Sequence, residues 1–290
     1  MGRGDLLDEE WARLEPHPPR SAGLDGRWQC HRRVINGILF RQRTDLPWRD
    51  LPSSFGKWKT VHDRHRRWSA DGTWERILRA VQADADGLID WSMVSVDSTS
   101  CRAHRHAAGA HSRPPRVPGR RSTPVQHRTD EALGRSKGGL TCEIHLAGEG
   151  GRRPLAFVIT PGHRGDAPQL IPVLEQIRVP RLGGGHPRTR PDHLGGDRAY
   201  SSRLNRRHLR RQIKHTIPEP KSQRANRQQR GSKGSRPTGF DREIYRRRNE
   251  VERTINRLKI LRAVATRYDK RAYVFPGTVT VASIRLWLRT

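Results

Sequence analysis

Residues 245–259, YRRRNEVERTINRLK, decide the fold of this 290-residue chain. Polar side chains recur in this stretch at spacings of three, four and seven: Tyr245, Arg248, Glu252 and Lys259. On a helix these spacings place all of them within an arc of roughly 60°. Apolar residues form the neighbouring stripe: Ile244, Val251, Ile255 and Leu258. The stretch predicts a long helix over 241–261 that buries one stripe on a sheet and presents an acid, two cations and a phenol beside it.

Two further acids follow short strand-like runs upstream of this helix. Met93–Val96 predicts a strand that ends at Asp97, and His193–Gly196 predicts a strand that leads to Asp197, although its glycines weaken it. Clustered carboxylates are the ligands that hard divalent cations need, and phosphoryl transfer uses two such ions ~3.5–4 Å apart. Asp97, Asp197 and Glu252 could hold that pair. Salt bridging is the alternative for the helix acids: Glu252 would pair with Arg248, or Glu250 with Arg246.

The order of the remaining elements indicates an α/β fold. They are a hairpin over 140–147 and 154–160, a helix over 166–177, a helix from Ser201 to about Arg211, a strand over 213–217 and a last helix over 278–288. A strand, a hairpin and then alternating helix and strand are the layout of a ribonuclease-H-like mixed sheet with flanking helices. We expect this catalytic domain to span 89–290, with basic loops over 105–139, 181–192 and 219–239.

A small helical domain is expected over residues 1–88. Six of the eight tryptophans lie in this region, and the simplest interpretation is that they fill a small core. The alternative is that Trp48 or Trp58, interleaved with Lys57 and Lys59, touches DNA. A bundle of short basic helices fits a helix-turn-helix-like DNA-binding module.

Composition restricts the partners. Lys+Arg number 58 against 29 Asp+Glu, a formal net charge of +29, and the commonest polyanion that neutralises such an excess is nucleic acid. No run approaches the ~20 apolar residues of a membrane helix, and the first residues lack the plan of a signal peptide. Three widely spaced cysteines exclude a disulfide framework. We therefore expect a cytoplasmic, nucleoid-associated protein without a membrane partner.

Weaker candidate sites lie just after Asp97. Cys101, His104 and His106 are close enough in sequence to bind zinc, but a His-rich loop is the preferred interpretation. Ser98 or Ser100 beside His104 could suggest a nucleophile, yet a loop offers no oriented base.

The late helix resembles a known pattern. Tyr245-x2-Arg248-x3-Glu252-x6-Lys259 is similar to the helix signature of bacterial insertion-sequence transposases of the Asp-Asp-Glu superfamily, in particular insertion-sequence families four and five. The resemblance extends over about residues 30–289, through the segments 34–40, 45–52, 58–61, 96–99, 102–104, 138–141, 197–202, 248–259 and 265–270. Two departures are the glycines before Asp197, where such proteins are more apolar, and Arg198, where Lys is common.

The resemblance implies a function and a site. Asp97, Asp197 and Glu252 would be the catalytic, metal-binding triad for Mg²⁺ or Mn²⁺, with two ions. Tyr245, Arg248, Lys259 and Arg198 would contact DNA, as would Trp48, Lys57 and Lys59 of the N-terminal module. The implied protein is a DNA transposase, a homodimer on double-stranded DNA, that cleaves the ends of its insertion sequence and joins the 3′ ends to target DNA. A structure-specific nuclease on the same fold and an inactive DNA-binding copy are the alternatives.

Overall fold

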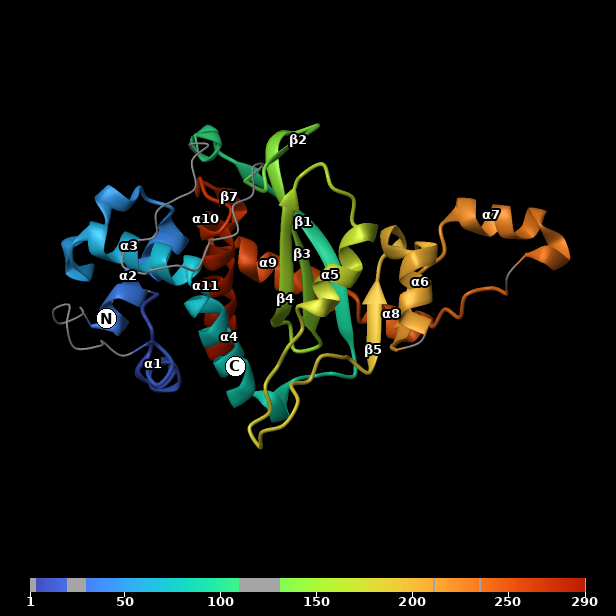
Figure 1. Cartoon of the computed structure of the whole chain (residues 1–290), viewed down its shortest axis with the longest axis horizontal. Helices are drawn as coiled ribbons and strands as arrows, with labels where there is room; N and C mark the ends of the chain where they lie inside the picture. The colour runs from blue at the N-terminus through green and yellow to red at the C-terminus, as the bar shows by residue number, and fades with distance from the viewer. Residues whose placement is uncertain (1–3, 20–29, 110–130, 211, 235, 290) are drawn as a thin grey trace.

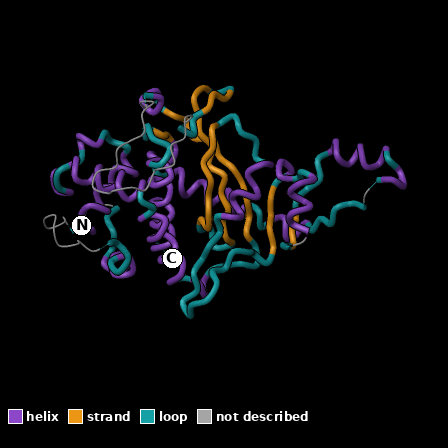
Figure 2. Tube along the Cα trace, viewed as in Figure 1, coloured by secondary structure: helices purple, strands orange, loops and turns teal. Residues whose placement is uncertain are grey.

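The computed structural model describes residues 4–19, 30–109, 131–210, 212–234 and 236–289, and it shows a mixed α/β protein. A sheet occupies the middle of the molecule and helices lie to both sides of it (Figure 2). None of the helices in these ranges is long and apolar enough to cross a membrane.

The sheet has the strand order expected for a ribonuclease-H-like fold. Its long strands are β1 (Val94–Ala103), β3 (Gly139–Glu149) and β4 (Pro154–Pro161), and the shorter strands are β2 (Gly134–Ser136), β5 (His193–Gly196), β6 (Lys214–Thr216) and β7 (Thr266–Arg267). The main order is β4-β3-β1-β5-β6. Strand β3 is antiparallel to β1 and β4, whereas β5 runs parallel to β1 and β6 parallel to β5. Strand β2 pairs with β3, and β7 with β1.

Two helices cover opposite faces of this sheet (Figure 1). Helix α9 (Asn249–Lys259) packs its apolar stripe on Ile144 and Leu146 of β3. Helix α5 (Leu170–Glu175) packs on the other side, in the core that contains Val94 and Val96. Side chains alternate between the faces along a strand, so each residue of β1 and β3 belongs to the α9 face or to the α5 face.

The N-terminal helices are α1 (Asp8–Leu14), α2 (His31–Thr44), α3 (Trp58–Ala70) and α4 (Thr73–Asp84). The C-terminal helix α11 (Val274–Leu288) packs against α3 and α4. Trp68, Trp74 and Trp287 are fully buried, and a continuous apolar core extends from these helices to β1. The tryptophans of α3 and α4 therefore build a core, as the simplest interpretation expected. The division at residue 88 stays a prediction.

Several predicted boundaries were wrong. Strand β1 continues past Asp97 to Ala103, because β3 pairs with it over Val94–Arg102. The helix over 241–261 is divided into α8 (Arg242–Arg246) and α9, since backbone hydrogen bonds from Arg247 and Arg248 tighten to carbonyls three residues back.

The basic segments also differ from simple loops. The 219–239 segment contains helix α7 (Lys221–Gln229), which buries no residue and projects from the body in Figure 1. The 105–139 segment contains a short helix, Arg105–Ala108, and strand β2, while 110–130 lie outside the described residues. The 181–192 segment has no helix or strand longer than a single bridge. Helix α6 (Arg203–Arg210) begins with a bond from the Asn205 N–H to the Ser202 hydroxyl rather than to Ser201.

The glycines of β5 do not prevent the strand from forming. A Cβ at Gly195 would lie 2.3 Å from the Met93 Cε, so the absent side chain gives room to Met93 of the neighbouring segment. Strand β5 is paired on both sides, by β1 and β6. Ladder hydrogen bonds and close packing thus offset the weak intrinsic propensity of glycine for strands.

A buried histidine makes this fold sensitive to acid. Trp74 Nε1 donates to His65 Nδ1 (3.2 Å), and His65 Nε2 lies 3.1 Å from the Thr278 hydroxyl, which donates to Asp269. Burial lowers the pKa of His65 to about 4, against the opposing charge of Asp269. An unfolded histidine titrates near 6.5, so the unfolded state takes up the proton first as the pH falls.

We expect about 3 kcal/mol of unfolding free energy, present above pH 6.5, to be lost as the pH falls to 4. Urea unfolding at pH 7 and pH 4.5 measures this loss, and a His65→Gln variant is the control because glutamine keeps a donor and an acceptor but does not titrate. Equal pH dependence in both proteins would contradict the assignment to His65.

Candidate active site

The two strand acids lie side by side on adjacent parallel strands. Val96 of β1 is paired with Gly196 of β5 as the last residues of that ladder, and Asp97 and Asp197 come directly after them. Leu146, which faces α9, is the cross-strand partner of Asp97. Because partners across a ladder share a face, the Asp97 side chain is on the α9 face. Asp197 Oδ1 accepts a hydrogen bond from the Ala199 N–H (2.8 Å) and so caps the short helix Arg198–Tyr200.

Arg248 joins the first acid to the third. Its Nη1 donates to Asp97 Oδ2 (3.1 Å) and its Nη2 donates to Glu252 Oε1 (2.6 Å). The guanidinium is 17% exposed, whereas the Glu252 side chain is 45% exposed. The expected alternative, an Arg248–Glu252 ion pair, therefore exists, but the same arginine brings Glu252 to Asp97 as well. Glu250 pairs with Arg152 rather than with Arg246.

Neighbouring charges act on these groups. Burial raises the pKa of Asp97, the Ser98 N–H and Arg248 oppose that rise, and the charges of Asp197 and Glu252 add to it. Burial acts to lower the pKa of Arg248, but the charges of Asp97, Glu252 and Tyr245, with a hydrogen bond to Tyr245, together raise it. The charges of Asp197 and Glu252 thus act against ionisation of Asp97, and a cation bound beside Asp97 would relieve this repulsion.

The other candidate DNA contacts of this domain are Lys259, Tyr245 and Arg198. Lys259 Nζ donates to the Thr99 hydroxyl (3.0 Å) and to the Ser100 carbonyl (3.1 Å), two turns along α9 from Glu252. The Tyr245 ring lies between Phe240 (5.1 Å between ring centroids) and the Arg248 guanidinium (6.0 Å). Arg198 is exposed.

The candidates of the N-terminal region are arranged differently. Trp48 is half-buried against the rings of His62 and His65, with the Arg41 guanidinium 5.3 Å from its ring. Lys57 and Lys59 are exposed at the start of α3. In this structure Trp48 therefore packs against neighbouring side chains. Lys57 and Lys59 are exposed, so their ammonium groups are accessible to a polyanion.

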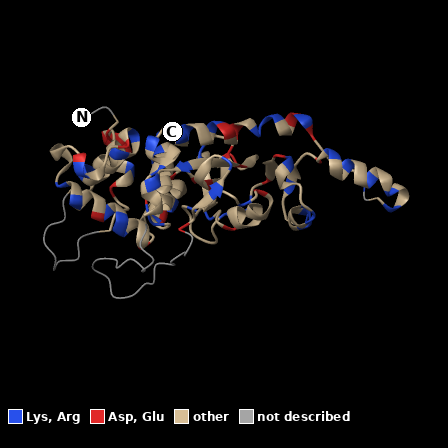
Figure 3. Cartoon of the chain, turned by 90° about the horizontal axis from the view of Figure 1, so that it is seen from above, with Lys and Arg blue, Asp and Glu red and all other residues tan. Residues whose placement is uncertain are grey.

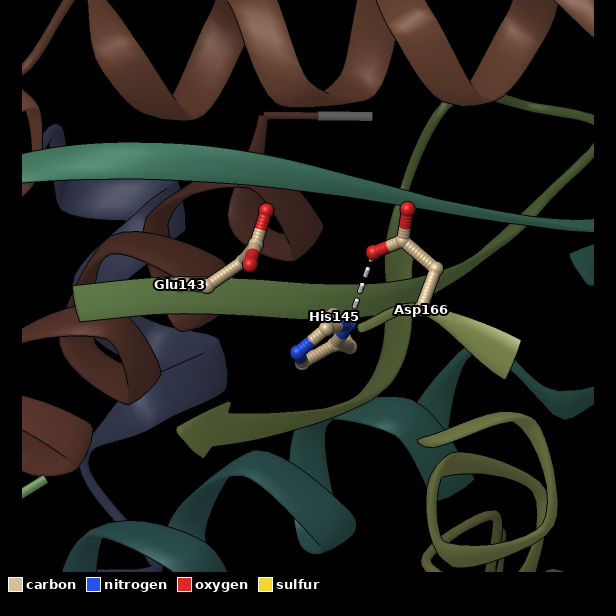
Figure 4. A group of neighbouring side chains, drawn as sticks. All are labelled: Glu143, His145 and Asp166. Carbon is tan, nitrogen blue, oxygen red and sulfur yellow. Dashed lines mark ion pairs between the residues drawn. The ribbon is translucent and has the colours of Figure 1, made fainter. Parts of the chain in front are cut away.

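A polar cluster that the sequence analysis missed lies on the α5 face. The ligand atoms of Glu143, His145 and Asp166 are all within 4.8 Å of one another, and Figure 4 shows the side chains pointing together. Burial lowers the pKa of His145, and the charge of Asp166 opposes that change. The signal that could have revealed the cluster is the i, i+2 spacing of Glu143 and His145 in a strand; Asp166 is distant in sequence.

Cys101, His104 and His106, the candidate zinc ligands, do not form a three-ligand cluster in the described structure. Cys101 is buried opposite Cys142 in the β1–β3 ladder, while His104 stacks on Tyr268 with ring centroids 4.5 Å apart. In the described ranges, the Glu143 cluster alone gathers three or more His, Cys or acid ligands at metal-binding distance.

Two family models match the chain in tandem. The model described as "Putative transposase of IS4/5 family" matches residues 6–78. The model described as "Transposase DDE domain" matches residues 89–284, which is more than half of the chain.

Curated relatives agree with these models. The chain is 30% identical to a protein of Brucella ovis named "Putative transposase for insertion sequence element IS6501", over 52% of this chain and 100% of that protein. It is 38% identical to a 16.2 kDa protein of insertion element IS402 from Burkholderia cepacia, over 36% of this chain and 76% of that protein. Among solved structures, the Mos1 strand transfer complex matches with a TM-score of 0.26 and 11% identity, covering 93% of this chain and 79% of that one.

Proposed function

The chain belongs to the DDE transposase family, and from this premise we propose that it cleaves the DNA ends of an insertion sequence and joins the 3′ ends to target DNA. DNA transposition is the general activity of the family, and the family implies the use of a divalent metal. The observation that supports the finer proposal has two parts: Asp97 and Asp197 directly follow paired residues of the adjacent strands β1 and β5, and the Arg248 guanidinium bridges Asp97 to Glu252 of α9.

The donor set fits divalent cations. Three carboxylates supply only oxygen ligands, which Mg²⁺ and Mn²⁺ prefer. Burial raises the pKa of Asp97, and the charges of Asp197 and Glu252 add to that rise. Asp97, Asp197 and Glu252 would hold the ions, two in this proposal. When bound, such ions activate an oxygen nucleophile and stabilise the leaving oxygen.

Arg248 supplies the positive charge between Asp97 and Glu252 in the structure. A guanidinium pairs with phosphate as well as with carboxylate. Once divalent ions neutralise Asp97 and Glu252, Arg248 could therefore pair with a DNA phosphate instead of these carboxylates. Tyr245 packs beside it and Lys259 lies further along the same helix face, so the three residues form a row that positions the DNA end.

Further DNA contacts would come from basic surfaces. A groove of about 1360 Å³ lies between β6 and the segment that leads into α8, with Arg206, Arg210, Lys214, Arg236 and Arg242 in its walls. Lys and Arg are spread over both the helical region and the sheet region in Figure 3. Arg198, Lys57 and Lys59 add exposed charge, and we place the protein on nucleoid DNA in the cytoplasm, as a homodimer that holds two ends.

A strand-joining assay tests the proposal. Purified protein receives pre-cleaved duplex ends, taken from the DNA that flanks its own gene and bearing free 3′-hydroxyls, with Mg²⁺ and a second duplex. We expect joined products without any nucleotide cofactor, because transesterification conserves the phosphodiester bond. In Ca²⁺, which holds ligands at 2.3–2.6 Å rather than 2.0–2.1 Å, assembly on DNA should occur with little chemistry.

The assay also separates the alternatives. Cutting in Mg²⁺ without joined product, across varied target DNA, would indicate a nuclease. Tight binding of the ends without chemistry in Mg²⁺ or Mn²⁺ would indicate an inactive DNA-binding copy.

Replacing Lys259 tests the proposed row of Tyr245, Arg248 and Lys259. We expect Lys259→Ala to weaken binding of the cleaved end about tenfold and to leave metal affinity nearly unchanged, because Lys259 lies ~10 Å along the axis from Glu252. Gel-shift titration of the cleaved end and calorimetric Mn²⁺ titration measure the two quantities. Arg253→Ala removes an exposed cation of the same helix from another face and is the matched control. A loss of Mn²⁺ affinity as large as in Glu252→Gln would refute this role.

A further inference from the structure

The Glu143–His145–Asp166 cluster is separate from the acids of the active site. His145 is the cross-strand partner of Ser98, and Glu143 is the partner of Ser100, whereas Asp97 is opposite Leu146. Successive residues of a strand alternate between faces, so the cluster lies on the α5 face and Asp97 points to the α9 face. Arg248, Lys259 and the rest of α9 are on the far side of the sheet.

The loop after β4 brings Asp166 next to His145. After β4 the backbone passes so close to β3 that a Cβ at Gly162 would lie 1.9 Å from the Thr141 hydroxyl oxygen. The Gly162 N–H donates to the Thr141 carbonyl (3.2 Å). The following residues then carry Asp166, half-buried, to the His145 ring.

One side of the His145 ring contacts Thr160. The Thr160 hydroxyl lies 2.9 Å from His145 Nε2 and can donate to the Pro161 carbonyl at 3.4 Å, an arrangement that favours the proton on Nε2. A neutral imidazole with its proton on Nε2 has a bare lone pair on Nδ1. That Nδ1 faces Asp166 Oδ1 at 3.5 Å.

The facing atoms of His145 and Asp166 are buried without hydrogen-bond partners among the described residues. His145 is 1% exposed, and neither its Nδ1 nor Asp166 Oδ1 has a hydrogen-bond partner in the described structure. With the proton on Nε2, two lone pairs face each other in a buried place and repel, and with the proton on Nδ1 the N–H has no hydrogen-bond acceptor in the described ranges, so either arrangement is destabilising. An ion that accepts both lone pairs would remove this destabilisation.

We propose that Glu143, His145 and Asp166 bind one divalent transition-metal ion, of which Zn²⁺ is the best fit. Bonds of ~2.0–2.1 Å to nitrogen and oxygen in a tetrahedral site separate two ligands by ~3.3 Å, close to the distance from Nδ1 to Oδ1. An imidazole ligand favours Zn²⁺ over Mg²⁺, and the general order of affinities favours it over Mn²⁺. The ion would fasten the 162–166 loop to β3.

The test is metal binding without DNA, so its result is independent of the proposed transposition. Full-length protein treated with EDTA and dialysed is titrated with Co²⁺, whose visible absorption is strong in a tetrahedral site, and Zn²⁺ is then added as competitor. We expect one equivalent of absorbing Co²⁺ that Zn²⁺ displaces. His145→Gln and Asp166→Asn should each weaken binding at least tenfold while the circular dichroism spectrum stays that of the wild type.

Two controls make the result specific. His163→Gln removes an exposed histidine of the same loop, and the double variant Asp97→Asn/Glu252→Gln removes ligands of the other face; both should keep the absorbing equivalent. Absence of Co²⁺ and Zn²⁺ binding by the wild type would overturn the proposal. The proposal would also be overturned if either control lost the Co²⁺ signal while Asp166→Asn kept it. The Asp166 side chain is 30% exposed, so this substitution does not require a buried ring to repack.

Discussion

Changing Asp97, Asp197 or Glu252 to the corresponding amide should reduce DNA cleavage by at least about 10³-fold while the protein still binds DNA ends. Bound metal supplies several kcal/mol of transition-state stabilisation, and each 1.36 kcal/mol is a factor of ten in rate. An amide keeps the size of the side chain but loses the negative charge. End binding should persist or tighten, because each change removes one charge that repels phosphate.

Cleavage of labelled ends on a denaturing gel and gel-shift titration of the same DNA measure the two effects. Glu250→Gln is the matched control, because Glu250 lies two residues before Glu252 on α9 and pairs with Arg152 away from the cluster. A variant that cleaves at the wild-type rate would remove its residue from the proposed triad.

Arg153→Met should lower the free energy of unfolding by about 3–5 kcal/mol, since removal of one partner leaves a buried charge uncompensated. Arg153 Nε donates to Glu149 Oε1 (2.8 Å), and the Glu149 side chain is 0% exposed. The guanidinium also donates to the Leu88 carbonyl and lies 4.3 Å from the Trp287 ring. It therefore ties the end of the helical region, the β3–β4 hairpin and α11 together.

Guanidinium chloride unfolding measures this loss. Arg152→Met is the control, because Arg152 is the next residue and its pair with Glu250 is partly exposed (44% and 25%); a change of no more than about 1 kcal/mol is expected there. The double variant Glu149→Gln/Arg153→Met should recover part of the loss. If Arg153→Met and Arg152→Met unfold alike, the buried pair does not hold these parts together.

Much of the candidate site could be predicted from local sequence. The period of 3.6 over 245–259 identified the helix face that carries Glu252, and the short strand-like runs before Asp97 and Asp197 indicated that each acid follows a strand residue. These features depend on residues within a few positions of each other, so periodicity and residue type report them directly. The hairpin of β3 and β4 was predictable for the same reason.

Tertiary structure decided what depends on partners distant in sequence. The length of β1 follows from its pairing with β3, and β5 forms despite Gly195 because β1 and β6 flank it. Arg248 reaches Asp97, 151 residues away, only because α9 packs across the sheet.

The sequence by itself therefore determined the order of the elements, the α/β class and the residue types at the strand ends and on the late helix. Only the tertiary structure decided that Trp48 packs on His62 and His65, that α7 projects from the body, and that Asp166 meets His145. Local propensity acts between near neighbours, whereas side-chain contacts arise from chain segments whose approach is set by the packing of the whole core.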